Sequence, residues 1–591
     1  MKRRDFLKYG SAGIAGVALG GLTKMPLVRI GNVFAESSGA WKFGVMGDTQ
    51  WTIHGADPSN PTMTDYSTDP AGQSDPYSVA ASIINQIDPM FVQQGVQFVI
   101  QVGDLTDCGT TRAIQARSNI ARTNLTANGI DFFPVRGNHE TYGYEYGDTA
   151  TDFGVAAMQN AFPQMAGSEI VSSATNFVPS SVASDCISYS FDCNNARFLM
   201  LDFWCNGTKN TAAAGYNFGY DVNTQQAWIT EQLSSRSSGA HAFVITHQPL
   251  MAEDHQDTIF TGYTNANPLW QNAFYSSLQG NNVGYYISGH DHMHQRSIIA
   301  SPDGNSHVQE LICASCSSKF YTPVASLTNS NWFGQKGRET SISQELYTVG
   351  YYIFTVDGPL VTVDYYSSAP LAPTPVNPAT NSSAISDGNY PGTANGSNLV
   401  TPSFTFTKQE TWGYSLNGAQ YTILEGSGYT TTQISFTDPT TGNSTTAGIT
   451  KNSAVMDYNG RYLTKTVDAY YADRTTVTNA YAISDVLALV GVMNLGSDTY
   501  GITMSYDPTV ALSRTDINNG RMISVNSQDH NGNWVNAVNF NNGGHSRFIY
   551  GPFNKAYPVG TYGVDTTNHI AWAIVNYDGD FTNFAVIGTG Y

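Results

Sequence analysis

The sequence predicts an α/β domain followed by an all-β domain. From Trp41 to about Tyr366, short apolar runs alternate with helical stretches, which is typical of an α/β fold. The next 36 residues hold six prolines, many Ser and Asn, and one charged residue. After them, turn signals containing Gly recur between short strand-like runs. A chain of 591 residues is long enough for two folded units joined by a linker.

The first 35 residues are interpreted as an export signal and not as part of the fold. Arg3 and Arg4 form a twin-arginine pair, and a weakly apolar stretch rich in Gly and Ala follows from Tyr9 to about Leu22. Ala35 closes a small-residue cleavage site. A retained membrane anchor is the alternative, but this stretch is too short to span a bilayer stably. We therefore expect the twin-arginine export machinery as a partner, a periplasmic or secreted location, and no stable membrane span.

Charge is sparse and acidic along the chain. Charged residues make up 12% of the sequence, and 27 Lys and Arg against 46 Asp and Glu give a net charge of −19. Beyond the N-terminus no basic stripe occurs, which argues against a nucleic acid as the main partner. The six cysteines are few for this length, and an oxidising destination permits disulfides without demanding them. Cys313-Ala-Ser-Cys316 follows an apolar run, so a structural role is favoured over a redox pair.

The α/β domain is expected over residues 36–366. A helix is predicted over Tyr77–Ile87, because Val79, Ile83 and Ile87 share one face. The expected strands are the short apolar runs at Phe43–Met46, Phe98–Val102, Phe132–Val135, Phe198–Leu201, Phe243–Ile245 and Tyr285–Ile287. The segment Tyr351–Tyr366 is expected to form an antiparallel hairpin that turns at Asp357-Gly358.

The rest of the chain divides into a linker and a second domain. Residues 367–402 are expected to be a linker, because a segment rich in Pro, Ser and Asn buries too little apolar surface to order itself. Residues 403–591 are expected to form an all-β domain, as a sandwich, because dipeptides that tolerate positive φ recur there. These are Asn417-Gly418, Asn459-Gly460, Asn519-Gly520, Asn531-Gly532 and Asp578-Gly579.

Five of the expected strands end in polar residues of the types that bind metal ions. The five segments are Gly47-Asp48-Thr49-Gln50, Gly103-Asp104-Leu105-Thr106-Asp107, Gly137-Asn138-His139-Glu140, Thr246-His247-Gln248-Pro249 and Gly289-His290-Asp291-His292. In open α/β sheets, ligands bind at the carboxyl ends of the strands. We therefore expect these five loops to converge in one crevice.

These residue types suit two divalent cations. A carboxylate can bridge two ions, while imidazole and amide oxygen complete each coordination shell without adding negative charge. Two metals about 3.5–4 Å apart can clamp a phosphate, share a nucleophilic hydroxide and steady the leaving oxygen.

The five motifs, in this order, resemble those of the calcineurin-like metallophosphoesterase superfamily, whose pattern is D-x-H, GDxxD, GNH[DE], H and GHxH. The resemblance covers about residues 41–366 and leaves out the C-terminal third. It implies a metallophosphoesterase β-sandwich flanked by helices, with βαβαβ motifs. It also implies a dinuclear enzyme that hydrolyses phosphate mono- or diesters by direct attack of metal-bound hydroxide.

The resemblance implies a role for each matched residue. The first metal would be bound by Asp48, Gln50, Asp104 and His292. The second metal would be bound by Asp104 as the bridge, Asn138, His247 and His290. His139 would be the general acid at the leaving oxygen, and Asp107 would hold its ring and favour its charged form. The two ions would be Fe, Mn or Zn, as divalent or trivalent cations.

The sequence departs from familiar branches of this pattern at three positions. Gln50 replaces the usual His of D-x-H, and a neutral amide is a weaker ligand. Asp107 stands where the purple acid phosphatases have a metal-bound Tyr, which disfavours that branch. Cys108 stands where the Ser/Thr protein phosphatases place a phosphate-binding Arg, so that class is disfavoured even though Arg136 precedes Gly137.

Two other classes of function are less well supported. In the first, the phosphoesterase domain is inactive and the β domain binds a glycan or a cell-surface partner through Trp412, Trp534 and Trp572. Core packing explains these tryptophans better, and of the ligands only Gln50 is unusual. A glycosidase with paired carboxylates has no supporting motif.

The remaining polar residues have ordinary interpretations. His54, His241, His255 and His294 are expected to be surface or packing histidines. Asp202 ends a predicted strand and is expected either to line the crevice or to cap a helix.

Overall fold

The computed structural model does not describe every residue of the chain. It describes residues 39–50, 79–106, 109–141, 153–167, 171–181, 186–204, 208–209, 216–217, 222–255, 259–260, 268–317, 319–323, 337–370, 374–377, 382–384, 403–416, 418–424, 428–438, 442–453, 456–458, 461, 463, 465–470, 476–477, 480–490, 499–508, 523–528, 534–577 and 579–586. The expected export signal, residues 1–35, lies outside these ranges, as do His54, Asp107 and Cys108.

One layer of the α/β unit is a six-stranded sheet with the order β19-β16-β15-β1-β2-β3. Its strands are β1 (Trp41–Met46), β2 (Phe98–Gln101), β3 (Asp131–Pro134), β15 (Gly350–Asp357), β16 (Leu360–Ser367) and β19 (Thr407–Ser415). β1, β2 and β3 run parallel, so their carboxyl ends lie at one edge of the sheet. β15 and β16 form the expected antiparallel hairpin, and Gly358 in its turn has φ of +56°.

The second layer is an eight-stranded sheet with the order β14-β11-β12-β10-β9-β6-β5-β4. Its strands are β4 (Thr175–Pro179), β5 (Tyr189–Cys193), β6 (Ala196–Met200), β9 (His241–Ile245), β10 (Val283–Ser288), β11 (His294–Ala300), β12 (His307–Ile312) and β14 (Glu339–Glu345). β6, β9, β10 and β12 are parallel neighbours. The second sheet therefore also presents the carboxyl ends of its central strands at one edge.

Aromatic side chains fill the space between the two sheets. Phe43 stacks on Phe98 and on Phe354, with ring centroids 5.3 Å and 4.7 Å away. Phe198 and Phe243 meet the same ring edge-on from the second sheet, at 5.1 Å and 5.2 Å. All five side chains are fully buried, so this contact between apolar faces holds the two sheets together.

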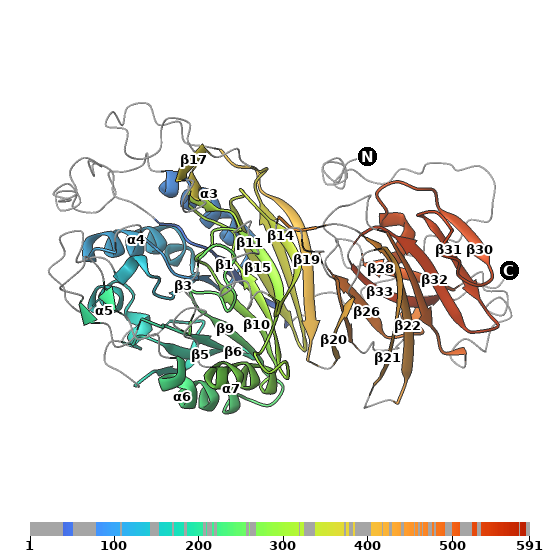
Figure 1. Cartoon of the computed structure of the whole chain (residues 1–591), viewed down its shortest axis with the longest axis horizontal. Helices are drawn as coiled ribbons and strands as arrows, with labels where there is room; N and C mark the ends of the chain where they lie inside the picture. Colours follow the sequence, from blue (N-terminus) through green and yellow to red (C-terminus); the bar gives the residue numbers. More distant parts are fainter. Residues whose placement is uncertain are drawn as a thin grey trace.

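Helices cover the outer faces of this sandwich (Figure 1). On the side of the first sheet lie α3 (Val79–Gln94), α4 (Thr111–Asn124) and α5 (Val155–Ala161). On the second sheet lie α6 (Val222–Ser234) and α7 (Pro268–Gly280). The expected β-sandwich flanked by helices is thus confirmed.

α3 is longer than the periodicity of the sequence predicts. It continues past Ile87 and through Pro89 to Gln94. Phe91 in this extension is fully buried and packs so closely on Gly44 that a Cβ atom at residue 44 would lie 2.5 Å from the phenyl ring. The added turns therefore bury a large apolar side chain against β1.

Strand β19 belongs to the first sheet, although the sequence places residues 403–591 in the second domain. It pairs antiparallel with β16, and Trp412 lies opposite Val363. Trp412 is 3% exposed and packs in the core of the sandwich, and Glu410 forms an ion pair with Arg296. The α/β unit therefore extends beyond the linker, to Ser415.

Part of the expected linker also forms strands. β17 (Thr374–Asn377) and β18 (Ser382–Ala384) pair with each other, and β18 pairs with β13 (Lys319–Tyr321). This pairing gives the backbone of a Pro- and Ser-rich segment hydrogen-bond partners that its own composition does not predict.

The C-terminal part of the chain consists of two further sheets that share one apolar core. The first contains β20 (Ala419–Leu424), β23 (Lys465–Tyr470), β24 (Thr476–Val477), β25 (Ala480–Ala482), β26 (Val486–Val490), β28 (Ile523–Gln528), β29 (Trp534–Asn536) and β33 (Gly579–Val586). The second contains β21 (Gly428–Thr437), β22 (Ser444–Ser453), β27 (Thr499–Ser505), β30 (Arg547–Tyr550), β31 (Thr561–Asp565) and β32 (Ile570–Val575). The expected all-β sheets are confirmed, and Trp534 and Trp572 lie buried in them.

Of the Asn-Gly and Asp-Gly dipeptides, Asn417, Asn459-Gly460, Asn519-Gly520, Asn531-Gly532 and Asp578 lie outside the described residues. β28 and β29, the strands before and after Asn531-Gly532, pair antiparallel as a hairpin requires. β32 and β33, the strands before and after Asp578, belong to different sheets.

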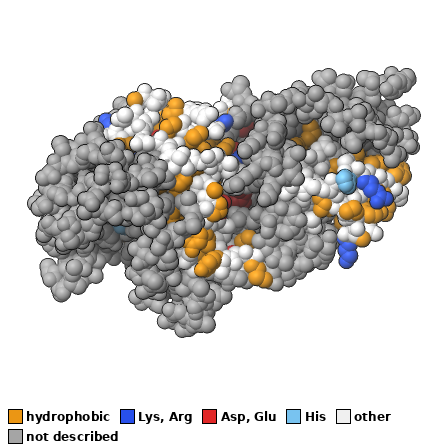
Figure 2. All heavy atoms as spheres, turned by 90° about the horizontal axis from the view of Figure 1, so that it is seen from above, with side chains coloured by type: hydrophobic (Ala, Val, Ile, Leu, Met, Phe, Trp, Pro, Cys, Tyr) orange, Lys and Arg blue, Asp and Glu red, His pale blue; other side chains and the backbone are white. Residues whose placement is uncertain are grey.

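Few charged side chains appear among the described residues on the face shown in Figure 2, in keeping with a sequence that is 12% charged. No helix among the described residues is long and apolar enough to cross a membrane. Cys186, Cys193, Cys313 and Cys316 are buried free thiols.

Candidate metal centre

The polar loops that follow five strands meet at one edge of the sandwich. Asp48 follows β1, Asp104 follows β2, and Asn138 follows β3. His247 follows β9, and the segment with His290 follows β10. Backbone hydrogen bonds join these loops, from Gln50 N to Asp104 O at 2.8 Å and from Gly289 N to His247 O at 2.9 Å. The carboxyl ends of the parallel strands therefore form a single site.

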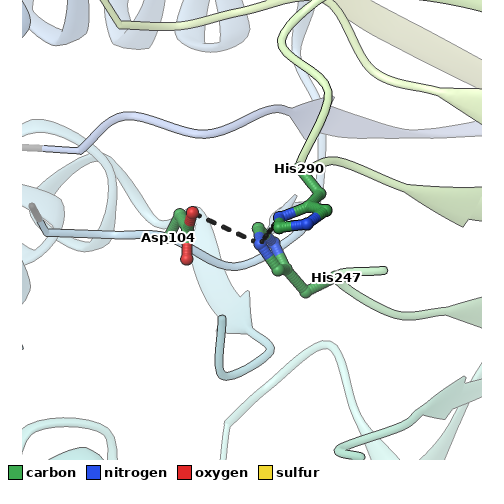
Figure 3. A group of neighbouring side chains, drawn as sticks. All are labelled: Asp104, His247 and His290. Carbon is green, nitrogen blue, oxygen red and sulfur yellow. Dashed lines mark hydrogen bonds and ion pairs between the residues drawn. The ribbon is translucent and has the colours of Figure 1, made fainter. Parts of the chain in front are cut away.

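Asp104, His247 and His290 form the first group of possible metal ligands. One ligand atom of each lies within 4.8 Å of the others, and all three residues are buried. Nε2 of His247 is 3.3 Å from Oδ2 of Asp104 and 3.1 Å from Nδ1 of His290. Figure 3 shows the three side chains pointing toward one another from separate loops.

A second group consists of Asp48, Asp104 and His292. Their ligand atoms also lie within 4.8 Å of one another, and all three residues are buried. Nε2 of His292 is 3.9 Å from Oδ1 of Asp48. Asp104 belongs to both groups, so one carboxylate stands where it can contact two cations.

The ring orientation of His247 is determined by a hydrogen bond outside the cluster. Its Nδ1 atom lies 2.8 Å from the carbonyl oxygen of Val102. A carbonyl can only accept, so Nδ1 carries a proton, and Nε2 is the ring nitrogen left to bind a metal ion beside Asp104 and His290. This is the arrangement that fixes a histidine as a metal ligand.

Asn138 joins the first group through its amide. Oδ1 of Asn138 is 3.0 Å from Nε2 of His247. The hydroxyl of Thr141 donates to the carbonyl of Asn138 at 2.6 Å, which closes the turn that carries this residue. An amide oxygen at this position can complete the shell of a cation without adding charge.

Gln50 lies between Asp104 and His139. Its Nε2 atom is 3.4 Å from Oδ2 of Asp104 and 3.0 Å from Nε2 of His139. Its Oε1 atom is buried and has no hydrogen-bond partner within the described part of the chain. A buried carbonyl oxygen is costly unless a donor or a cation meets it.

Two glycines allow the loops to approach one another this closely. A Cβ atom at Gly137 would lie 2.1 Å from Oδ1 of Asp104. At Gly289 it would lie 2.4 Å from Oδ2 of Asp48. Any side chain at either position would push a carboxylate out of the cluster, which explains why these motifs begin with glycine.

Four of the expected ligands have backbone conformations that L-residues rarely adopt. The φ angles are +39° at Gln50, +45° at Asp104, +72° at His290 and +50° at His292. Such conformations cost about 1–3 kcal/mol each and concentrate at functional sites. Here they turn the side chains of consecutive loops toward one point.

The buried carboxylates of the cluster favour positive charge beside them. Burial raises the pKa of Asp48 to about 7. Burial lowers the pKa of His247, but Asp104 and Asp48 outweigh this effect and raise it to about 10. Burial also opposes ionisation of Asp104, yet His247 and His139 hold its pKa well below the usual range. Two buried carboxylates require positive charge nearby, and a divalent ion supplies it.

His139 lies at the edge of this cluster. Its backbone N–H donates to Oδ1 of Asp104 at 3.0 Å, and its ring nitrogen Nε2 lies 3.8 Å from Oδ2. Its side chain is 18% exposed, whereas that of His247 is fully buried. His139 therefore lies where a bound molecule can reach it. Asp107, its expected partner, is outside the described residues.

Glu140 is a supporting residue that the sequence analysis does not assign. Its carboxylate accepts hydrogen bonds from Thr106 N at 3.0 Å and from Gly137 N at 2.8 Å. It thereby joins the loop that carries Asp104 to the loop that carries Asn138. The acidic residue after the histidine in Gly-Asn-His-Glu is the sequence signal for this role.

His255 is a second residue that the sequence analysis misses, because it is expected to be a surface or packing histidine. Its ring lies 4.1 Å from that of His290, and its Nδ1 atom is 2.6 Å from Oδ1 of Asp291. Tyr321 contacts the rings of both His255 and His292, at 4.6 Å and 5.1 Å. His255 lies in the loop that begins at His247, which is the only hint of its place that the sequence offers.

His241 and His294 have the packing roles expected of them. Nε2 of His241 lies 2.8 Å from the carbonyl of Gly358, and Nδ1 of His294 lies 2.9 Å from the hydroxyl of Tyr352. Both histidines are buried.

Arg136 and Asp202 bind each other and do not line the site. Nη2 of Arg136 is 2.7 Å from Oδ2 of Asp202, and both side chains are buried. The carboxylate of Asp202 also accepts Ile187 N at 2.9 Å and Trp204 N at 3.2 Å. Asp202 is thus the buried partner of Arg136 and of two backbone N–H groups, and Arg136 is already engaged by a carboxylate.

The donor set fits two cations. It offers carboxylate, imidazole and amide oxygen, which suit Fe, Mn and Zn. The shared carboxylate of Asp104, the Nε2 atom of His247 that faces it and the unpartnered Oε1 of Gln50 all favour occupancy by metal.

Comparison with known proteins gives one family match. Residues 42–294 match the model of a family described as calcineurin-like phosphoesterase. This part of the chain, less than half of its length, is thus similar to that family. No match was found among curated proteins.

Several solved structures are similar to part of the chain at low identity. The purple acid phosphatase PPD1 from seeds of yellow lupin (Lupinus luteus) is 15% identical over 56% of this chain and 52% of its own, with a TM-score of 0.33. PhoD is 12% identical over 64% and 70%, with a TM-score of 0.38. GAP50, described as the anchor in the inner membrane complex of Plasmodium, is 14% identical over 56% and 84%, with a TM-score of 0.30. The match thus spans about half the length of the lupin phosphatase.

Proposed function

We propose that the protein is an exported, dinuclear, metal-dependent hydrolase of phosphate mono- or diesters. One observation carries this proposal: Asp104 belongs to both groups of buried ligands. A single carboxylate shared by two groups is the arrangement that places two cations side by side, and such a pair suits phosphate-ester hydrolysis.

Each proposed ligand would hold one of two ions. Asp48, Gln50 and His292 would hold the first ion, and Asn138, His247 and His290 would hold the second, with Asp104 between them. Ions held here would supply a hydroxide nucleophile and neutralise the charge on the phosphoryl oxygens. The protein itself contributes orientation, because backbone strain and close glycine contacts leave the ligands little freedom to move.

His139 is proposed to act as the general acid. It is attached to Asp104 by its backbone N–H, and its ring is more exposed than those of the ligand histidines. A proton on that ring would be delivered to the departing oxygen of the substrate. Asp107 would orient the ring and favour its charged form.

Export is a separate part of the proposal. The twin-arginine pair at Arg3 and Arg4 and the cleavage site at Ala35 support transport by the twin-arginine machinery to the periplasm or the medium. Secretion of an epitope-tagged precursor, compared with an Arg3→Lys/Arg4→Lys variant, tests this part. Unchanged export of the double variant would contradict it.

Metal content and turnover test the enzymatic proposal together. The mature protein should bind two ions per chain and should hydrolyse at least one of a matched pair of phosphomonoester and phosphodiester substrates. Removal of the ions with a chelator should abolish turnover, and Mn²⁺ or Zn²⁺ should restore it. Turnover that survives complete metal removal would refute the proposal.

A further inference from the structure

Arg461 connects the C-terminal β domain to the α/β unit. It lies between β22 and β23, and its guanidinium contacts three carboxylates through three different nitrogens. Nη2 is 2.8 Å from Oε1 of Glu253, Nη1 is 2.7 Å from Oε2 of Glu339, and Nε is 2.6 Å from Oδ2 of Asp457. Glu253 and Glu339 belong to the α/β unit, so a single side chain from the second domain pairs with two acids of the first.

The backbone around Arg461 presents this side chain in a defined position. Asp457 N donates to Arg461 O at 2.8 Å, and Arg461 N donates to Oδ1 of Asp457 at 2.8 Å. Tyr458 N donates to Oε1 of Gln344 on β14, also at 2.8 Å, which is a second contact between the domains. Arg461 is therefore held by backbone hydrogen bonds to Asp457 and not by its own side chain alone.

The positive charge of Arg461 balances the buried carboxylates that it contacts. The side chains of Glu253, Glu339 and Asp457 are fully buried, and that of Arg461 is 16% exposed. Burial would lower the pKa of Arg461, but Glu339, Glu253 and Asp457 hold it above the usual range. Removing the guanidinium would leave buried carboxylates facing one another, which is strongly unfavourable.

Glu253 is hydrogen-bonded, through its backbone N–H, to the segment that contains two proposed metal ligands. Glu253 N donates a short hydrogen bond to Oδ2 of Asp291, and Asp254 N and His255 N donate to the same carboxylate at 3.3 Å each. Asp291 stands between His290 and His292 in the sequence. Arg461 thus contacts the loop that contains Glu253, and this loop is hydrogen-bonded to the segment that carries the proposed ligands His290 and His292.

We propose that Arg461 is a positioning residue for the metal centre. The C-terminal domain, through the Arg461–Glu253 ion pair, holds residues 250–255 against Asp291 and so keeps His290 and His292 in place. This inference rests on the proposed function, because it takes those two histidines as ligands. It implies that the metal site is complete only when the second domain is docked.

Glu339 provides a matched comparison for Glu253. Both acids are buried and both pair with Arg461, but Glu339 begins β14 and has no hydrogen bond to Asp291 among those that the structure describes. If Arg461 only joined two domains, the two acids would be equivalent. If it positions the metal loop, only Glu253 should affect metal binding.

The test compares the full-length mature protein with Arg461→Ala, Glu253→Gln and Glu339→Gln. Titration with Mn²⁺ should show affinity about tenfold weaker in Arg461→Ala, as for other residues that orient metal ligands. Glu253→Gln removes the ion pair to the metal loop and should weaken Mn²⁺ binding in the same direction. Glu339→Gln removes only the contact to β14, so it should lower the melting temperature and leave Mn²⁺ affinity near that of the wild type. Hydrogen exchange at residues 250–255 should be faster in Arg461→Ala and in Glu253→Gln, but not in Glu339→Gln.

Unchanged Mn²⁺ affinity and unchanged exchange in Arg461→Ala would overturn the proposal, as would equal Mn²⁺ affinities in the two glutamine variants. If Arg461→Ala does not fold, Arg461→Lys keeps the charge and loses the forked contact, and it is compared with the same two glutamine variants. Mn²⁺ binding and hydrogen exchange need no substrate. A wild-type protein without phosphatase activity would therefore count against the proposed function, while this test would still decide the role of Arg461.

Discussion

His247 turns its Nε2 atom toward Asp104, 3.3 Å from Oδ2, while its Nδ1 atom faces the carbonyl of Val102 at 2.8 Å. The carbonyl of Val102 on one side and the carboxylate of Asp104 on the other fix the orientation of the imidazole ring, with Nε2 facing the cluster. The ligands around Asp104 are thus directed by the ends of strands that are themselves buried in the sandwich. This rigidity is what a site needs to hold two cations at a short separation.

Gln50 is expected to be a real but weak ligand. Its Oε1 atom is buried without a hydrogen-bond partner in the described part of the chain, so a cation is the simplest partner for it. Gln50→His should maintain activity or tighten the first metal, and Gln50→Ala should weaken that metal more than the second. Metal titration of the three proteins checks this. Identical affinities would show that Gln50 does not coordinate.

His139 should affect the chemistry without affecting the metals. His139→Ala should keep both ions and reduce kcat by about 10²–10⁴-fold for substrates with poor leaving groups, because those need the proton. A nitrophenolate leaves readily without it, so the loss should be smaller there. Asp107→Asn should show a milder form of the same pattern. Loss of metal in His139→Ala, or an equal loss of kcat for every leaving group, would rule out the acid role.

The boundary between the two units is expected to lie after β19. A fragment that ends at Ser367 lacks Trp412, which is 3% exposed in the core, and loss of a buried Trp costs about 3–5 kcal/mol. A fragment that ends just after Ser415 keeps that side chain. Thermal unfolding should show the longer fragment to be clearly the more stable. Equal melting temperatures would place β19 outside the folded unit.

Glu410 should make the α/β unit sensitive to acid. Burial raises its pKa, but Arg296 and His294 outweigh this and lower it to about 2, from an ordinary value of 4.5. Such a depressed pKa is worth about 3 kcal/mol of stability above pH 4.5, and this contribution disappears as the pH falls through 2.

Glu410→Gln is the control for this effect. The difference in unfolding free energy between wild type and variant should be largest near about pH 6 and should narrow by about pH 3. Urea unfolding at both pH values measures it. A difference that does not change with pH would mean that Glu410 is not charged in the folded protein.

Much of the candidate metal centre could be predicted from the sequence, because each proposed ligand follows a strand in a short, characteristic motif. Asp48, Asp104, His247, His290 and His292 all lie where the motifs place them. Their convergence follows from parallel strands that end at one edge of the sandwich.

Other features depend on contacts between distant parts of the chain and have no local signal. A strand at residues 407–415 is compatible with a sheet of either domain. Its pairing with β16 and the burial of Trp412 place it in the first sheet of the α/β unit. His255 has no motif, and its position follows from hydrogen bonds to Asp291. Nothing in the sequence around Arg461 indicates a special role, because Glu253 and Glu339 are far from it in the chain and contact it only in the folded structure.

Asp104 is the most direct test of a dinuclear centre. Because its carboxylate would contact both ions, Asp104→Asn should lose at least one metal and nearly all turnover, whereas a substitution of a ligand in one group alone, such as His292→Ala, should spare the other ion. The measurement is the number of Mn²⁺ or Zn²⁺ ions bound per chain, with kcat on a phosphomonoester determined on the same samples. We expect two ions in the wild-type protein and one or none in Asp104→Asn. Two ions and near-normal kcat in Asp104→Asn would contradict the account.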